Sequence, residues 1–295
     1  MILEQLIGNL IQGLVLGAIY GMATMGLSLI FGVLRVVNVG HGAFIMVGAF
    51  IAWWLFSALG VIPILAIPVA LVIGLALGFI FYYSVLRRLI KAPELASLLA
   101  TFSIGVLLEE TAKLIFGSEF RGYNWAVGKI TLPMTVLPMT KLYACLGSVL
   151  IAVLLYIWFN KTRAGTAMRS VVEDSEGAKV CGVNVEGVYA MSFALGIGLT
   201  VVSGVLLTMF IPVGINPYMG GPYTLKAFVI AVLGGLASPY GAFFGGLVFG
   251  LIENGSYTLF AFLPGVEPFA LTRFFSFMML LVILLIRPTG LLRAK

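Results

Sequence analysis

Long apolar runs separated by short polar connections dominate this chain of 295 residues. Most runs approach the roughly 20 residues that a helix needs to cross the apolar core of a bilayer. They lack the alternation of membrane-barrel strands, whose segments are about 10 residues long. The pattern predicts an all-α, polytopic helical membrane protein with about eight to ten transmembrane segments in one domain, 1–295. The runs are 5–33, 40–59, 61–86, 95–116, 141–159, 188–211, 224–237, 240–260 and 268–286.

Composition agrees with this pattern, because 61% of the residues are hydrophobic and 9% are charged. A soluble domain carries about 25% charged residues, so this chain lacks the charge to cover a surface in water. The net charge of +6 would suggest nucleic-acid binding in a soluble protein. Here it indicates how the chain is oriented in the membrane instead, since Lys and Arg accumulate in cytoplasmic loops. We therefore expect no nucleic-acid partner.

Basic residues collect in three connections that the count of spans places on one face. That face is predicted to be cytoplasmic, so the C-terminus lies there, and the N-terminus and the connection 117–140 lie outside. The number of spans depends on the short run 224–237. If this run is part of a broken helix, every segment before it lies on the opposite side of the membrane. The clusters are Arg87, Arg88 and Lys91; Lys161, Arg163, Arg169 and Lys179; and Arg287, Arg293 and Lys295.

One polar island interrupts the apolar pattern at residues 161–187, which read KTRAGTAMRSVVEDSEGAKVCGVNVEG. A connection between two spans needs a few residues. A longer connection, dense in charge and on the predicted cytoplasmic side, indicates a site for a partner.

Charged residues inside the runs are candidates for a transport pathway, because each costs roughly 2.5–3.5 kcal/mol on insertion scales. Glu109 and Glu110 precede Lys113 by about one helical turn, so a helix places Lys113 beside both. These side chains line a pathway in one interpretation, and form an ion pair that reaches the outer interface in the other. Glu253 and Lys226 are expected to face protein, and the sequence leaves open whether they meet.

Two breaks between the runs concentrate polar, glycine or proline residues. The sole histidine, His41, follows Asn38 in the first break, and irregular backbone at membrane depth occurs where it is buried or lines a cavity. A proton-relay histidine and a histidine hydrogen-bonded to the turn are both open interpretations. The second break, 211–222, contains Asn216 and three prolines, which exclude a continuous helix. It forms either an entrance gate or a plain connection.

Motifs for chemistry are missing from the sequence. No G-x-x-x-x-G-K-[ST] phosphate loop, dinucleotide motif, nucleophile elbow or zinc-binding helix occurs. The two cysteines, Cys145 and Cys181, lack the spacing of a metal site. We therefore expect no enzyme activity, no metal and no cofactor in this chain. If ATP powers its function, the ATPase is a separate chain.

A short internal similarity links two parts of the chain. HGAF at 41–44 resembles YGAF at 240–243, and each tetrapeptide follows a glycine-containing turn and opens a Gly-rich helix. Transporters are often built from repeats that meet at the substrate site. An internal repeat and a chance match in a Gly/Ala/Phe-rich sequence both remain open.

Several short motifs, taken in their order and spacing, point to one family. They are GLSLIFG at 26–32, NVGHG at 38–42, the loop 169–183, GINP at 214–217, KAF at 226–228, VLGGL at 232–236 with GA at 241–242, and RPTGL at 287–291. Through them the chain resembles, over nearly its whole length, the permease subunits of branched-chain amino-acid ABC importers of the LivH type.

This resemblance implies a multi-pass protein of the cell inner membrane with several partners. They are a second related permease, giving a heterodimer, two ABC ATPases that bind ATP, and an external substrate-binding protein. The implied substrates are branched-chain or other hydrophobic amino acids. Urea or short-chain amides are the alternative within the family, and a secondary transporter or channel is the alternative outside it.

The resemblance also implies that 161–187 is a cytoplasmic coupling loop, in which a short helix docks in a groove on the ATPase. We expect that helix at 167–180, with Gly182 as its C-cap. The expected coupling residues are Arg169, Glu173, Asp174, Gly177, Ala178 and Gly182. The candidate residues for the translocation pathway are Asn38, His41, Glu109, Asn216 and Glu253.

Overall fold

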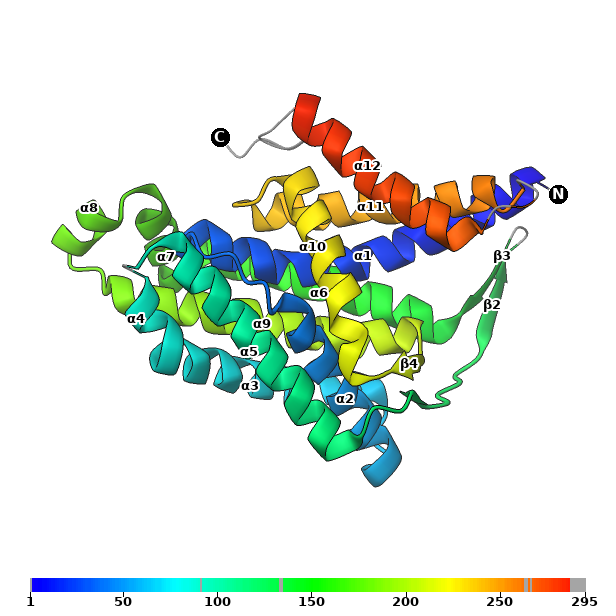
Figure 1. Cartoon of the computed structure of the whole chain (residues 1–295), viewed down its shortest axis with the longest axis horizontal. Coiled ribbons are helices and arrows are strands. Elements are labelled where there is room, and N and C mark those ends of the chain that lie inside the picture. Colours follow the sequence, from blue (N-terminus) through cyan, green and yellow to red (C-terminus); the bar gives the residue numbers. More distant parts are fainter. Residues whose placement is uncertain (1, 91, 133–134, 263–264, 266, 287–295) are drawn as a thin grey trace.

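The computed structural model describes residues 2–90, 92–132, 135–262, 265 and 267–286. Within these ranges, each of the nine apolar runs forms a helix, so the predicted all-α class is confirmed (Figure 1). The nine helices are α1 (Ile2–Leu34), α2 (His41–Leu59), α3 (Pro63–Phe81), α5 (Glu94–Phe116), α6 (Met139–Lys161), α9 (Val185–Phe210), α10 (Gly220–Gly234), α11 (Pro239–Phe260) and α12 (Pro268–Ile286).

Shorter elements fill the connections between these helices. A π-helical turn η1 (Tyr82–Leu86) and α4 (Arg87–Leu89) extend α3. The polar island forms α7 (Arg163–Glu173) and α8 (Ser175–Val180). Strand β1 (Arg121–Gly122) pairs antiparallel with β4 (Val213–Ile215), β2 (Lys129–Leu132) pairs antiparallel with β3 (Thr135–Pro138), and a 3-10 turn η2 (Pro217–Met219) precedes α10.

The number of spans is lower than the number of apolar runs. Six described helices are each long and apolar enough to cross a membrane, and α10 with α11 forms a bent pair that counts as a seventh span. The bend is 112°, and α12 contributes an apolar stretch shorter than the other spans. The described residues therefore hold fewer clear spans than the eight to ten expected, because α10 has 15 residues and turns into α11 instead of crossing alone.

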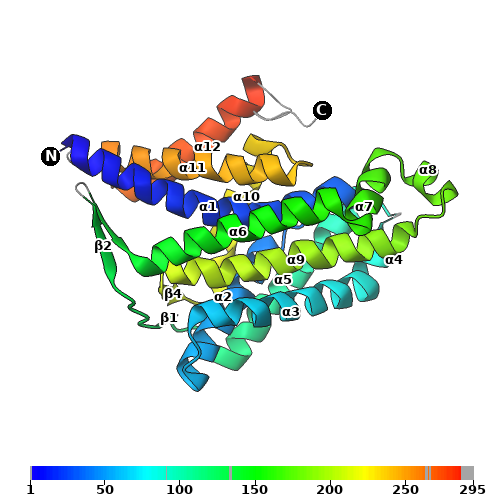
Figure 2. The ribbon, with the colours of Figure 1, turned by 180° about the vertical axis from the view of Figure 1, so that it is seen from behind.

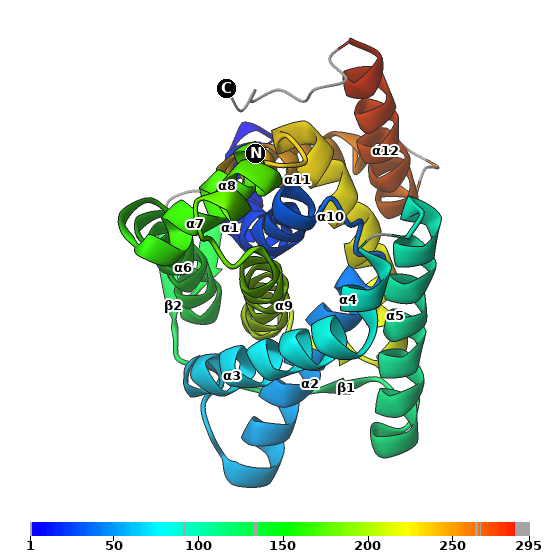
Figure 3. The same cartoon turned by 90° about the vertical axis from the view of Figure 1, so that its left-hand side faces the viewer.

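Helices α1 and α9 form the buried centre of the bundle. Nearly all of each is buried, whereas less than a third of the most apolar stretch of α3, α5 and α6 is buried within the single chain. The view along the bundle shows the other helices arranged around these two (Figure 3). The exposed helices are rich in apolar side chains, as expected for surfaces that face lipid or a second membrane subunit.

Glycines allow α1 and α11 to pack at backbone distance. A Cβ atom added to Gly17 would lie 2.6 Å from the carbonyl oxygen of Gly246, and one added to Gly21 would lie 2.5 Å from that of Phe243. Small residues at helical spacing favour such contact in lipid. Lipid chains are as apolar as the side chains, so the hydrophobic effect does not drive helices together there, and close packing takes its place. The glycine spacing seen in the sequence therefore explains this helix pair.

Helix α10 is held at both ends by further glycine contacts. At its start, Gly220 lies against Gly42, whose N–H donates a 2.8 Å hydrogen bond to Thr224 Oγ1. At its end, Gly234 lies against Gly241. The HGAF and YGAF tetrapeptides thus pack on opposite ends of the same helix, although the internal repeat itself stays a prediction.

The two ends of the bundle differ in what they carry. The basic helix α4 and the island helices α7 and α8 lie at one end, whereas the N-terminal start of α1 and the β2–β3 hairpin lie at the other (Figures 1 and 2). This arrangement agrees with the predicted separation of the polar island from the N-terminus. The predicted basic residues Lys91, Arg287, Arg293 and Lys295 lie outside the described residues.

Candidate translocation cleft and cytoplasmic island

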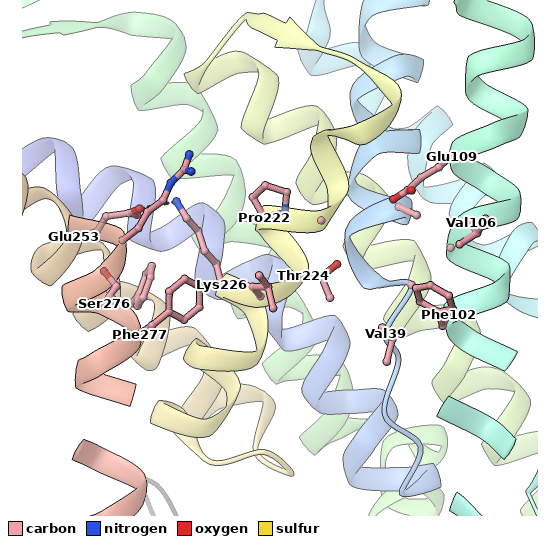
Figure 4. A pocket seen from close by; sticks show the side chains of 17 residues that line it. Val39, Phe102, Val106, Glu109, Pro222, Thr224, Lys226, Glu253, Ser276 and Phe277 are labelled. Atoms are coloured by element: carbon pink, nitrogen blue, oxygen red, sulfur yellow. Dashed lines mark hydrogen bonds and ion pairs between the residues drawn. The ribbon is translucent and has the colours of Figure 1, made fainter. Parts of the chain in front are cut away.

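An open cleft of about 580 Å³ lies on one side of the bundle. Its walls come from α5, from α10 with α11, and from α12, and the start of α2 forms part of its floor (Figure 4). We call it the lateral cleft. Most of its lining is apolar, and four charged side chains enter it: Glu109, Lys226, Glu253 and Arg273.

An ion pair between α10 and α11 stands in one wall of the lateral cleft. Lys226 Nζ lies 2.5 Å from Glu253 Oε1, and it also donates a 2.8 Å hydrogen bond to the hydroxyl of Tyr20 on α1. The side chains of Lys226 and Glu253 are 21% and 17% exposed. The ammonium lies 4.8 Å from the Tyr20 ring centroid, a distance at which an aromatic face attracts a cation. Three helices are joined at this point.

The other two charges of the lateral cleft have no comparable partner. Within the described residues, neither Glu109 nor Arg273 makes a hydrogen bond or an ion pair. Lys113, expected beside both neighbouring acids, pairs with Glu110 at 3.4 Å instead. That exposed pair is not part of the cleft lining, whereas Glu109 lines the cleft on the wall opposite Glu253 (Figure 4).

The polar island is folded as two helices instead of the single helix expected at 167–180. Asp174 separates them because its backbone is extended, with φ −150° and ψ 105°, and its side chain accepts a 3.0 Å hydrogen bond from the N–H of Glu176. An aspartate that caps the start of α8 in this way cannot also continue α7. Thr162 caps α7 in the same manner through the N–H of Gly165.

Gly182 ends α8 as predicted. Its φ of +85° is left-handed, a conformation that glycine adopts without steric cost. The N–H of Gly182 donates to the Lys179 carbonyl, and the N–H of Val183 donates to the Ala178 carbonyl, both at 3.0 Å. This double pattern satisfies the last carbonyls of a helix and reverses the chain.

The six expected coupling residues divide into exposed and packed groups. Glu173, Asp174 and Gly182 are exposed, and the neighbouring Val180 at the tip of α8 is 88% exposed. By contrast, Arg169 donates to the carbonyl of Phe159 on α6 and lies over its ring. Ala178 is buried, and a Cβ on Gly177 would meet the Asp174 carboxylate. The first group is available to a partner, and the second holds the island in place.

Comparison with known proteins identifies the family. A family model described as "Branched-chain amino acid transport system / permease component" matches residues 9–284. The chain belongs to this family of transport permeases. The resemblance drawn from the motifs is confirmed.

Three curated permeases of this kind are similar over most of the chain. The high-affinity branched-chain amino acid transport system permease protein LivH of Escherichia coli K12 is 30% identical over 96% of this chain and 94% of its own length. The corresponding protein BraD of Pseudomonas aeruginosa is 28% identical with the same coverage. The probable branched-chain amino acid permease LivH of Methanocaldococcus jannaschii is 27% identical over 91% of this chain and 87% of its own length. No solved structure matches the chain.

In this permease, two candidate pathway residues lie behind the lateral cleft rather than in its lining. Asn38 and His41 are buried, while the residues between them, Val39 and Gly40, reach the cleft. His41 Nδ1 lies 3.4 Å from Thr200 Oγ1 on α9. His41 Nε2 and Asn38 Nδ2 have no hydrogen-bond partner among the described residues.

Asn216 has a structural position at the start of η2. Its Oδ1 accepts a 2.9 Å hydrogen bond from the N–H of Tyr218, and its Nδ2 donates at 2.9 Å to the carbonyl of Gly214. Both bonds stabilise the turn that leads into α10. The lining of the lateral cleft includes Glu109 and Glu253 from the candidate set, but not Asn216.

The sequence interpretation missed Arg273. It is the sole charged residue in the apolar run 268–286, and the cost of a charge in such a run is the signal that could have found it. The pairing of Lys226 with Glu253 was left open, because it depends on the bend between α10 and α11.

Removing Lys226 should destabilise this permease. We expect Lys226→Met to leave the Glu253 carboxylate unpaired in a mostly buried site, at a cost on the order of 3 kcal/mol. The double variant K226M/E253M should recover most of that loss because both charges are gone. The apparent Tm of the purified permease in detergent measures the effect. Lys113→Met is the control, since an exposed ion pair contributes little to stability; a Tm for Lys226→Met equal to this control would contradict the role of the pair.

Proposed function

We propose that this chain carries branched-chain or other hydrophobic amino acids across the inner membrane, as the permease subunit of an importer driven by separate ABC ATPases. The observation that carries the proposal is the lateral cleft. Its apolar lining suits an aliphatic side chain, and its charges suit the two ionised groups of an amino acid. Membership in the family and the names of the similar permeases support the same substrate class.

We propose that a second, related permease closes the lateral cleft and forms a heterodimer with this chain. The cleft has α5 and α12 in its walls, and both helices carry exposed large apolar side chains, among them Phe102 and Phe277 in the lining and Phe274 beside it in sequence. A polar pathway open to lipid would expose charges to hydrocarbon, so a pathway of this form needs a protein cover. An external binding protein delivers the substrate at the end that carries the β2–β3 hairpin.

We propose that the island end of the bundle is cytoplasmic and receives the ATPases. Basic residues in α4 and in the island support this orientation, because positive charge is retained on the cytoplasmic side. In this proposed orientation, the N-terminus lies outside and the C-terminus lies in the cytoplasm. Glu173, Asp174 and Gly182, with the exposed Val180, form the contact surface in this proposal, which we call the coupling tip.

The packing of the island supports transmission of force from the coupling tip. Arg169 joins α7 to the end of α6, and the turn after Gly182 leads within a few residues into α9. Because α9 is almost fully buried and packs against α1, α2 and α3, displacement of the tip reaches the centre of the bundle through rigid helices.

The complete importer should take up leucine, isoleucine and valine into proteoliposomes with ATP. Unlabelled branched-chain amino acids should compete with labelled leucine when the binding protein is present, whereas urea and acetamide should not, because neither carries the charges that the cleft can pair. Competition by urea or acetamide instead would support the alternative substrates. Uptake driven by an ion gradient without ATP would support a secondary transporter and contradict the proposal.

Reversing charge at the coupling tip should weaken ATP hydrolysis and transport together. We expect Glu173→Lys in the reconstituted importer to lower substrate-stimulated ATP hydrolysis and leucine uptake together by at least roughly tenfold, as for loss of a charged contact at a protein interface. Glu94→Lys is the matched control, because Glu94 is an exposed acid at the same end of the bundle, outside the island. Unchanged hydrolysis with Glu173→Lys, in a complex that assembles normally, would contradict coupling through this surface.

A further inference from the structure

We infer that Glu253 and Arg273 form the polar subsite of the lateral cleft, where Glu253 binds the α-ammonium group of an amino acid and Arg273 binds its α-carboxylate. This inference rests on the proposed function, because it assigns individual atoms to a substrate of that class. It concerns two helices, α11 and α12, that pack against each other.

Glu253 offers a carboxylate oxygen without a donor. One oxygen, Oε1, is engaged by Lys226, but Oε2 is buried and has no hydrogen-bond partner among the described residues. A buried charged oxygen without a donor is costly, so this site is completed by a group that donates hydrogen bonds. Glu253 also lines the cleft, so a ligand bound there lies beside its carboxylate.

Arg273 offers the complementary charge. Its guanidinium has no hydrogen bond or ion pair within the described part of the chain, although it lines the cleft. An arginine presents a planar fork of donors that matches the two oxygens of a carboxylate. Ser276 and Phe277 follow Arg273 at helical spacing and line the same cleft, and Figure 4 shows both on the side of the cleft where Glu253 lies.

Apolar side chains line the cleft together with these two charges. Phe249 and Phe277 lie on the helices that carry Glu253 and Arg273, and Phe102 and Val106 form the opposite wall on α5. A substrate whose charged end meets Glu253 and Arg273 therefore directs its side chain toward apolar surface. The gain is about 25 cal/mol for each Å² of apolar surface removed from water.

The overall charge of the lateral cleft selects for a zwitterion. Lys226 and Arg273 contribute two positive charges and Glu109 and Glu253 two negative charges, so the described lining is neutral in sum. A molecule with one charge of each sign enters without creating an imbalance. A singly charged amine or carboxylic acid leaves one charge unpaired, and an uncharged amide leaves both unpaired, at the desolvation cost of an ion in a low-dielectric site.

Lys226 and Tyr20 are positioning residues in this arrangement. Lys226 holds Glu253 Oε1 at 2.5 Å and is itself held by the hydroxyl of Tyr20, which leaves Oε2 for the ligand. They do not touch the substrate themselves.

Photo-leucine, whose side chain carries a diazirine and whose charged groups are unchanged, tests the placement directly. It is delivered by the binding protein to the assembled importer in nanodiscs and activated by light. We expect adducts on the apolar wall, at Phe102, Val106 or Phe277, and their loss when excess leucine is added. Adducts confined to other helices would overturn the subsite. The experiment uses the parent protein, so its result does not depend on whether a variant folds.

Leucine uptake by proteoliposomes tests the two charges. We expect Glu253→Gln and Arg273→Gln each to lower the initial rate roughly 10- to 100-fold, as for loss of a hydrogen bond to a charged group. The photo-leucine adducts should fall in parallel, while Arg273→Lys should restore part of the rate. Glu110→Gln and Lys113→Gln are the controls, because that pair is exposed outside the cleft, and both should transport like the parent.

The outcomes separate this inference from the proposed function. If the parent importer takes up leucine while Glu253→Gln and Arg273→Gln complexes transport normally, the subsite is overturned and the function stands. If Glu109→Gln abolishes uptake and Glu253→Gln does not, the ammonium site lies on α5 and the assignment is wrong. If the parent complex with its binding protein takes up no aliphatic amino acid, the proposed function itself fails.

Discussion

Glycine contacts at both ends of α10, and the Lys226–Glu253 pair in its middle, fix the one short helix on which the cleft depends. Gly220 meets Gly42 at the start, and Gly234 meets Gly241 at the end. Between these points, Lys226 joins α10 to α11 and to Tyr20 of α1. Because the backbones touch, α10 cannot shift along α2 or α11 without breaking several contacts together. The wall of the cleft is therefore a rigid part of the bundle.

The centre of the bundle connects this wall to the polar island. Helix α9 begins directly after the island, passes through the core, and contacts α2 where Gly48 and Gly204 allow close approach. Near the start of α2, His41 lies beside Thr200 of α9, and the adjacent Gly40 lines the lateral cleft. A movement of the island thus has a continuous path of packed helices to the floor of the cleft. In this account, the buried His41 belongs to that connection and does not touch the substrate.

The sequence predicted the helices themselves better than the contacts between them. All nine apolar runs are helices, since length and hydropathy alone specify a segment that can sit in a bilayer. A broken helix at 224–237 was one expectation from the sequence, but the 112° bend was not readable, because it depends on how α10 and α11 pack against each other at Gly234 and Gly241. For the same reason the meeting of Lys226 with Glu253 stayed open. The break at Asp174 was missed because a local hydrogen bond of its side chain competes with the amphipathic pattern that favours one helix. Arg273 is the one charged residue in the apolar run 268–286, which marks it as unusual in the sequence. Its role becomes specific only once the structure places it in the lining of the cleft.

Solvent access to a single cysteine in the lateral cleft tests the central claim most directly. With Cys145 and Cys181 replaced by serine, Val106→Cys lies on the α5 wall, and Leu154→Cys on the exposed face of α6 is the comparison. In the assembled importer, a water-soluble methanethiosulfonate should modify Cys at 106 and not at 154, and leucine with its binding protein and ATP should change the rate of modification. If the reagent modifies neither cysteine and substrate does not change this result, the cleft is filled by lipid or protein and is no part of a pathway.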